Sequence, residues 1–250
     1  MTKFSYQLYS SRNFPPLSNT LKELAALGYA EVEGYGGLFS DVEQAESLRS
    51  ELDANDLTMP TAHIGLDMVE ADPKTVVGIA KALGVGMVFG PHIGEDQRPS
   101  DAAGWRAFGA RLAEAAKPLE DAGIRFGWHN HDFEFTHGSA VHPMDWIFEG
   151  GPDLAFEFDL AWCIRAGVDH IGFIERHADR LLAAHIKDIA PVGEKADEDG
   201  WADVGDGVID WRATFDALAK TKCQHFVAEH DNPSDGHRFA SRSIAFMNSL

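Results

Sequence analysis

The sequence predicts a (β/α)8 barrel that occupies the whole chain, residues 1–250, as a single domain. Short apolar segments alternate with longer amphipathic segments from one end of the chain to the other, and eight of the short segments can be recognised. The length also matches, because barrels of this type typically need about 250 residues. An open doubly wound sheet is the alternative. It is disfavoured because the first strand leads into Ser10–Asn13 rather than into a glycine-rich phosphate-binding turn.

The eight short segments are expected to be buried parallel strands. Each is rich in apolar residues and is bounded by glycine, proline or aspartate, as buried parallel strands usually are. In chain order they are Phe4–Tyr9, Tyr29–Gly34, Thr58–Ile64, Met87–His92, Ile124–Asn130, Leu154–Leu160, Leu182–Lys187 and His225–His230.

Helices are expected between these strands, and glycines mark several of their ends. Leu17–Leu27 has apolar residues at helical spacing and is followed by Gly28, a residue that commonly ends helices. The other expected helices are Asp41–Asn55, Pro73–Leu83, Ser100–Ala122, Ile209–Lys220 and Ser234–Asn248. The charged segment Gly193–Gly200 is expected to be an exposed loop after the seventh strand.

The composition is that of a globular protein with a strongly acidic surface. Hydrophobic residues make up 44% of the chain and charged residues 24%. Acidic residues outnumber basic residues 40 to 21, for a net charge of −19, so we expect neither a nucleic-acid partner nor a membrane partner. The first residues lack the apolar region of a signal peptide, and no apolar run approaches the roughly 20 residues of a membrane span. We therefore expect a cytoplasmic protein.

Histidines and carboxylates gather at the ends of the predicted strands. Seven of the eight strands end in such residues, and the carboxyl ends of barrel strands form one face, so a clustered polar site is expected there. Imidazole and carboxylate together suit a divalent transition metal better than Ca²⁺. A metal ion would also offset the repulsion among Glu157, Asp159, Glu229 and Asp231. Nucleophilic catalysis is disfavoured, because no GxSxG turn is present and Cys163 has no assigned histidine partner.

Five ordered motifs carry a resemblance that spans nearly the whole chain. They are Trp128–Phe135 (WHNHDFEF), Phe156–Trp162 (FEFDLAW), Ala184–Asp188 (AHIKD), Val204–Trp211 (VGDGVIDW) and Ala228–Pro233 (AEHDNP). With these motifs the chain resembles the xylose isomerase-like barrels of the sugar phosphate isomerase/epimerase family. Endonuclease IV, inosose dehydratase and hydroxypyruvate isomerase belong to the same superfamily.

The resemblance implies one divalent metal ion (Mn²⁺, Co²⁺, Mg²⁺ or Zn²⁺) with four ligands from strands five to eight. Carried over by motif, three ligands are Asp159, His185 and Glu229. The strand-five ligand of the family is usually a glutamate, and this sequence departs from the pattern with His129, Asn130 and His131. We expect His131 to be the fourth ligand, with Glu134 as a second candidate.

The resemblance also implies roles around the metal ion. Glu229 is expected to act as a general base as well as a ligand, with His131 or Glu134 on the opposite side of the substrate. Lys187 is expected to steady an enolate or bind a substrate oxygen, and Glu33 is a further candidate base. The residues expected to contact the substrate are His63, His92, His129 and Trp162.

The expected function is a metal-dependent sugar or keto-sugar isomerase or epimerase that removes a proton next to a carbonyl and passes through a metal-stabilised enediolate. A keto-sugar lyase, dehydratase or hydratase is the alternative, because two histidines replace the strand-five glutamate. An endonuclease IV-type repair enzyme is the third reading. Against it stand the charge of −19 and Trp162, which occupies the place of a zinc-binding histidine. No cluster of Arg or Lys marks a phosphate site, which favours a small, non-phosphorylated sugar substrate, and a homo-oligomer is left open.

Overall fold

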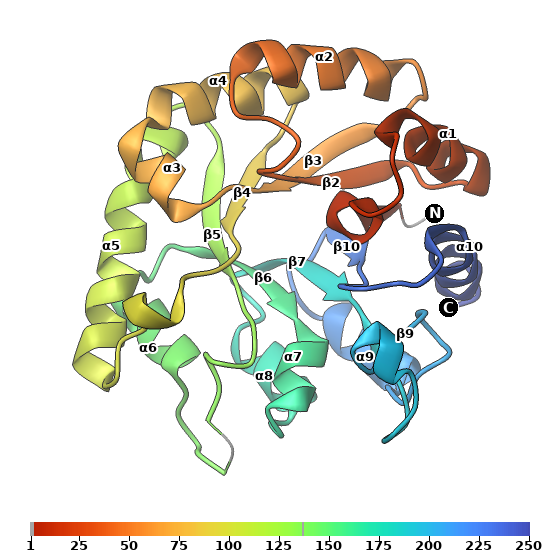
Figure 1. Cartoon of the computed structure of the whole chain (residues 1–250). Helices are drawn as coiled ribbons and strands as arrows, with labels where there is room; N and C mark the ends of the chain where they lie inside the picture. The colour runs from red at the N-terminus through yellow and green to blue at the C-terminus, as the bar shows by residue number, and fades with distance from the viewer. Residues whose placement is uncertain (1–2, 137) are drawn as a thin grey trace.

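Eight parallel strands close into a barrel in the computed structural model, which describes residues 3–136 and 138–250 (Figure 1). The strands follow one another around the barrel in chain order, and β1 closes it by pairing with both β2 and β10. The barrel strands are β1 (Phe4–Gln7), β2 (Glu31–Tyr35), β3 (Thr58–His63), β4 (Met87–Gly90), β5 (Arg125–His129), β6 (Ala155–Asp159), β7 (Leu181–Ile186) and β10 (His225–Ala228). The predicted (β/α)8 barrel is confirmed.

Helices surround the barrel, and six of them match the sequence prediction closely: α1 (Leu17–Leu27), α2 (Val42–Asp53), α4 (Pro73–Leu83), α5 (Ala102–Glu120), α9 (Trp211–Leu218) and α10 (Gly236–Met247). The helix α1 ends at Gly28, whose φ of 95° lies in the left-handed region that favours glycine. Aspartates begin other helices: Asp41 accepts the Gln44 N–H at the start of α2, and Asp101 accepts the Gly104 N–H at the start of α5.

Four short helices were not predicted: α3 (Leu66–Ala71), α6 (Pro143–Gly150), α7 (Leu160–Arg165) and α8 (His170–Arg176). Each has six to eight residues, which is too few for a helical period of apolar residues to stand out. The first strand also ends at Gln7 rather than at Tyr9, because Leu8–Ser11 forms a 3-10 turn. A small antiparallel sheet, β8 (Asp188–Ile189) with β9 (Trp201–Ala202), follows β7.

The interior of the barrel is apolar in its lower part and polar in its upper part. Phe89, Ala155 and Ala183 pack together in the lower interior, with Met87 and Leu182 against them. Nearer the carboxyl ends of the strands, the buried side chains are polar or charged: Gln7, Glu33, His63, His129, Glu157, Asp159 and His185. An ordinary barrel fills such layers with branched aliphatic residues. In the upper interior, polar and charged side chains therefore take the place of the aliphatic packing of an ordinary barrel.

The charged loop after β7 is only partly as predicted. Most of Gly193–Gly200 is exposed, but Glu198 is buried and forms ion pairs with Lys195 and Arg238. The predicted exposed loop is therefore correct except at Glu198, because a charge pattern does not show which carboxylate pairs with an arginine of another element. In the described part of the chain, no helix combines the length and the apolar character needed to cross a membrane.

Candidate metal centre

Asp159, His185 and Glu229 converge at the carboxyl ends of the last three barrel strands, and we call them the outer group. Each offers one ligand atom, and these atoms all lie within 4.8 Å of one another. His185 Nδ1 lies 2.8 Å from Glu229 Oε2 and 3.9 Å from Asp159 Oδ2. Asp159 and His185 are direct neighbours in the pairing of β6 with β7, so the register of the sheet itself brings them together. These are the three residues that the motifs predicted as ligands from strands six, seven and eight.

Lys187 places a cation among the carboxylates of this region. Its Nζ lies 2.6 Å from Asp231 Oδ2, 3.1 Å from Glu229 Oε2 and 3.5 Å from Asp159 Oδ2. The side chain is fully buried and faces the rings of Trp201 and Trp162. Burial alone would lower the pKa of Lys187, but the three carboxylates outweigh it and hold that pKa above its ordinary value. Lys187 is therefore charged.

The outer group is chemically suited to a divalent cation. Burial would raise the pKa of Glu229, yet Lys187 and His185 hold that pKa well below its ordinary value, so Glu229 is an ionised oxygen donor. Burial raises the pKa of Asp159 to about 6, against the influence of Lys187. Asp159 Oδ2 is buried and accepts no hydrogen bond from any described residue. Two carboxylates and one imidazole, with an unsatisfied oxygen among them, fit a divalent ion.

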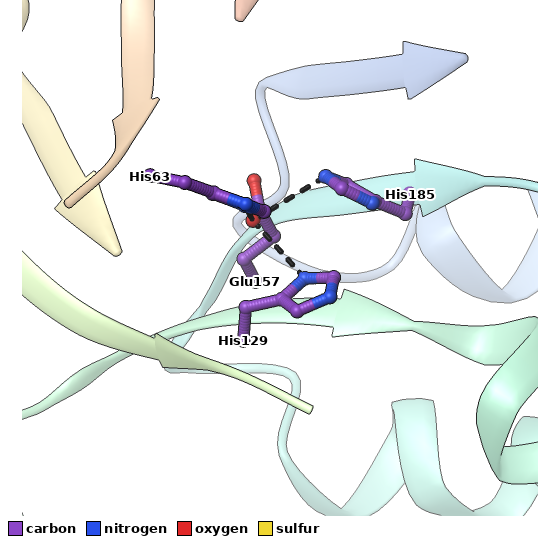
Figure 2. Close-up of side chains that lie close together, drawn as sticks. All are labelled: His63, His129, Glu157 and His185. Carbon is purple, nitrogen blue, oxygen red and sulfur yellow. Dashed lines mark hydrogen bonds and ion pairs between the residues drawn. The ribbon is translucent and has the colours of Figure 1, made fainter. Parts of the chain in front are cut away.

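A second set of donors lies deeper in the barrel, and we call it the inner group: His63, His129, Glu157 and His185. Figure 2 shows three imidazole rings directed at the Glu157 carboxylate. Glu157 Oε2 lies 2.5 Å from His63 Nε2, 3.2 Å from His129 Nδ1 and 3.4 Å from His185 Nε2. All four side chains are buried, and their ligand atoms also lie within 4.8 Å of one another. His185 belongs to both groups, through Nε2 to the inner group and through Nδ1 to the outer group.

Glu33 connects the inner group to the wall of the barrel. Its Oε1 accepts hydrogen bonds from Gln7 Nε2 at 2.7 Å and from His185 Nε2 at 2.8 Å, and it lies 3.2 Å from His63 Nε2. Burial would raise the pKa of Glu33, but His63 and His185 lower it to about 2. The side chain is fully buried and does not line the pocket described below. Glu33 therefore lies behind His185 and outside the pocket wall, and its role as a base stays a prediction.

A pocket of about 490 Å³ opens over both groups at the carboxyl ends of the strands. Its wall consists of Tyr9, Tyr35, Gly36, His63, Gly65, Pro91, His92, His129, His131, Trp162, Glu229 and Asp231. All four residues predicted to contact the substrate lie in this wall. Glu229 belongs both to the wall and to the outer group. None of the residues that line the pocket is Lys or Arg.

His131, the predicted fourth ligand, lies in the pocket wall but outside both groups. Its ring contacts those of Trp162 and His92, with centroids 5.4 and 5.3 Å away, and its buried Nδ1 has no hydrogen-bond partner in the described residues. Burial and the Lys187 charge lower the pKa of His131 to about 3, so its imidazole is neutral. A free nitrogen is therefore available, and its coordination to a metal ion stays a prediction.

Glu134, the second strand-five candidate, lies apart from the pocket. Its carboxylate accepts hydrogen bonds from Trp128 Nε1 and from the His131 backbone N–H, both at 2.8 Å. Trp128 packs against Phe108 of α5, so these bonds lie on the helix side of β5. Burial raises the pKa of Glu134 to about 8. The bond to the His131 backbone fixes the position of the segment that carries His131. Glu134 itself lies outside the pocket wall, and its role in catalysis stays a prediction.

Among the wall residues with polar side chains, the sequence reasoning left Tyr9, Tyr35 and Asp231 without an assigned role. It placed Glu157 among the clustered carboxylates but did not assign it as a ligand, although the residue stands two positions before Asp159. Residues two apart on a strand face the same side, so this spacing could have suggested Glu157 as a donor. The same rule relates Asp231 to Glu229. The two tyrosines carried no signal beyond their place at the ends of strands one and two.

The fold and the motif-bearing residues agree with one family model, described as the xylose isomerase-like TIM barrel, which matches residues 21–250. The chain belongs to this family. A curated relative, the rhizopine catabolism protein MocC of Rhizobium meliloti, is 24% identical over 256 residues and covers 89% of this chain and 77% of its own length.

Three solved structures share the fold at low sequence identity. A sugar phosphate isomerase/epimerase from Parabacteroides distasonis is 18% identical, with a TM-score of 0.83 over 100% of this chain and 94% of its own. The probable 3-DHS dehydratase AsbF from Bacillus anthracis is 12% identical, with a TM-score of 0.76 over 99% of each chain. The IolI protein, solved with a bound zinc atom, is 15% identical, with a TM-score of 0.76 over 99% of this chain and 96% of its own. The family is enzymatic, with isomerase/epimerase and dehydratase members among these neighbours.

Proposed function

We propose that this barrel is a divalent-metal-dependent isomerase or epimerase that acts on a neutral sugar or keto-sugar. One observation carries the proposal: Glu229 is at once a member of the outer donor group and a wall residue of the pocket. A carboxylate in both places can touch a metal ion and a substrate together. The isomerase/epimerase and dehydratase neighbours support a reaction that begins next to a carbonyl.

The pocket wall supports a neutral substrate. It contains Glu229 and Asp231 but no Lys or Arg to balance the charge of a phosphate. Tyr9, Tyr35 and Trp162 offer aromatic faces and polar tips, which suit a ring with hydroxyl groups. We therefore assign a non-phosphorylated polyhydroxylated ketone as the substrate class.

When bound by Asp159, His185 and Glu229, a divalent ion would supply positive charge beside the carbonyl oxygen and so favour loss of the neighbouring proton. The chain supplies the proton transfers. The bonds of Glu229 to His185 and Lys187 both use Oε2, which leaves Oε1 to take a proton from the substrate. The Lys187 ammonium lies beside this carboxylate and offsets charge that develops there. His131, a neutral imidazole in the pocket wall, is the candidate for exchanging the second proton.

A lyase or dehydratase reaction is the second candidate, and the strand-five residues favour it. The group proposed to work with Glu229 is an imidazole, whereas exchange between two equivalent carboxylates would suit a symmetric epimerisation. Both reactions share the first proton abstraction. They diverge in whether the second group returns a proton to carbon or assists a leaving hydroxyl.

The test is incubation of the enzyme with a panel of neutral ketoses and cyclic polyhydroxy ketones in D₂O with Mn²⁺, followed by NMR. We expect deuterium at the carbon next to the carbonyl of one substrate class, and the product to be a rearranged sugar or a dehydrated one. Glu229→Gln should lower the rate by about 10²–10⁴-fold. Glu194→Gln, an exposed glutamate, is the matched control. Exchange that is unaffected by Glu229→Gln, or no exchange with any ketone or divalent ion, would contradict the proposal.

A further inference from the structure

We propose that the inner group, His63, His129, Glu157 and His185, is a second metal site that selects zinc-like ions and holds its ion with protein ligands alone. This site differs from the outer group in position and in donor type. The proposal goes beyond the proposed function and does not require it.

The inner group supplies four donors, the number that a four-coordinate metal site needs. Four strands, β3, β5, β6 and β7, each contribute one inward-facing side chain, and the ligand atoms all lie within 4.8 Å of one another. Three imidazole nitrogens lie 2.5, 3.2 and 3.4 Å from one oxygen of Glu157 (Figure 2). Three nitrogens and one oxygen are a donor set that four-coordinate Zn²⁺ accepts, whereas Mg²⁺ and Ca²⁺ prefer oxygen.

Polar atoms of this group are left unsatisfied inside the barrel. His129 Nδ1 and Glu157 Oε1 are buried and have no hydrogen-bond partner among the described residues. Buried polar atoms are nearly always paired, so unpaired atoms in one cluster point to a ligand that completes it. The unpaired His129 Nδ1 is the nitrogen that lies 3.2 Å from Glu157 Oε2, so it belongs to the proposed donor set.

The charge of the cluster points the same way. Glu157 and Glu33 are both fully buried, and His63 Nε2 lies 2.5 Å from Glu157 Oε2 and 3.2 Å from Glu33 Oε1. Carboxylates in a barrel interior need compensating positive charge. A divalent ion held by the imidazole nitrogens and the Glu157 carboxylate would supply that charge at a fixed position.

Sharing of His185 couples the two sites. An ion in the inner group would bind His185 Nε2, and this nitrogen would then lose its hydrogen bond to Glu33. His185 Nδ1 could keep its proton and its hydrogen bond to Glu229. Ions in both groups at once would need His185 without either ring proton. A decisive experiment therefore measures the inner group with the outer group disabled.

The test uses Zn²⁺ alone with the double variant Asp159→Asn/Glu229→Gln. Both substitutions keep the size of the side chain, and Asn can still cap α7. We expect equilibrium dialysis with elemental analysis to find one zinc per chain. Adding His129→Asn or Glu157→Gln should weaken this binding by roughly 100-fold or more, since even supporting residues around a metal ion contribute 10–100-fold. His177→Asn replaces a buried histidine that bonds Asp145 away from both groups, and should leave the zinc in place.

Cobalt gives an independent readout in the same variants. Co²⁺ in the inner group should show the intense visible absorption of a four-coordinate site, and His129→Asn should abolish it while circular dichroism shows the fold intact. A double variant that binds no zinc, or zinc binding that is insensitive to Glu157→Gln, would overturn the proposal. So would a weak six-coordinate cobalt spectrum. None of these results bears on the proposed reaction, because the double variant is expected to be inactive in any case.

Discussion

Lys187 shows how one side chain can hold a polar interior together. Its ammonium lies within 3.5 Å of carboxylate oxygens from Asp159, Glu229 and Asp231, in a fully buried position. Removing one partner of a buried ion pair leaves charge uncompensated, which typically costs about 3–5 kcal/mol.

We therefore predict that Lys187→Met lowers the stability in chelator by about 3–5 kcal/mol, and that a divalent ion restores more stability to this variant than to the unchanged protein. The second effect follows because a cation in the outer group would take over the neutralisation of Asp159 and Glu229. Thermal unfolding with EDTA and with Mn²⁺ measures both. Lys222→Met, an exposed lysine paired with the exposed Asp179, is the control and should change little. Equal metal responses in the two variants would refute this assignment of Lys187.

For Glu33 we predict an effect on metal binding, because its carboxylate bonds His185. A carboxylate on the far nitrogen of a metal-bound histidine fixes the ring and strengthens it as a ligand. Glu33→Gln should weaken binding of Mn²⁺ at the outer group by about 10–100-fold and lower kcat, with KM for the ketone nearly unchanged. Titration of Mn²⁺ binding, independent of activity, checks it. A changed KM with unaltered metal affinity would instead mean that Glu33 touches the substrate.

The candidate site could be predicted in part at this scale. Asp159, His185 and Glu229 stand in recognisable motifs at strand ends, and strand register brings them together as the motifs imply. Glu134 stands in an equally recognisable motif, yet its carboxylate faces Trp128 on the helix side of β5. A motif gives the order of residues, but after the strand ends the period of two no longer tells which side a residue faces.

At the scale of elements, one buried carboxylate connects the loop between β8 and β9 to α10. Glu198 accepts hydrogen bonds from Ser234, through both its backbone and its hydroxyl, and from Arg238 of α10. Burial would raise the pKa of Glu198, but these bonds outweigh it and hold that pKa well below the ordinary value of 4.5. A pKa that is lower in the folded state stabilises the fold above the unfolded pKa, and the stabilisation disappears as the pH falls through the folded value.

Glu198→Gln should therefore lower the melting temperature at pH 7, by an amount equivalent to about 1–3 kcal/mol for lost charged hydrogen bonds. The difference from the unchanged protein should shrink as the pH falls below about 4.5, where the unfolded carboxylate takes up its proton. Melting curves from pH 3 to 8 measure it, with exposed Glu194→Gln from the same loop as the reference. A difference that stays constant across this range would show that charge plays no part.

The helices were predictable wherever the helical period of apolar residues was long. The helix α1 and the helix α4 fall on the expected residues, because a glycine ends each at the point where the apolar period stops. The short helices α7 and α8 were missed, since six or seven residues hold less than two turns and their formation depends on packing against the barrel.

At the scale of the whole molecule, polar residues in the barrel interior make stability depend on what is bound there. A ligand that binds only the folded state stabilises it by about 2.7 kcal/mol at a concentration 100 times its Kd. A chain of this length gains roughly 2–4 °C in melting temperature per kcal/mol. We predict that Zn²⁺ raises the melting temperature by roughly 5–10 °C and that EDTA reverses the gain.

Scanning calorimetry of the unchanged protein with each metal checks this prediction, and Ca²⁺ is the control because it disfavours imidazole. The triple variant Asp159→Asn/Glu229→Gln/Glu157→Gln, which impairs both donor groups, should show no zinc response. A response of unchanged size in that variant would place the stabilising ion elsewhere on the protein.

The carboxylate of Asp159 divides its two oxygens between two tasks. Oδ1 accepts the N–H groups of Ala161 and Trp162 and so begins α7, while Oδ2 faces the outer group. Trp162, which lies in the pocket wall, is thereby positioned by the same side chain that offers a ligand atom. Protein engineering that seeks a new substrate should leave this segment alone, because any change in it would disturb the chemistry along with the selectivity. Tyr9, Tyr35 and His92, which lie in the same wall at or after the ends of β1, β2 and β4, are the positions to diversify.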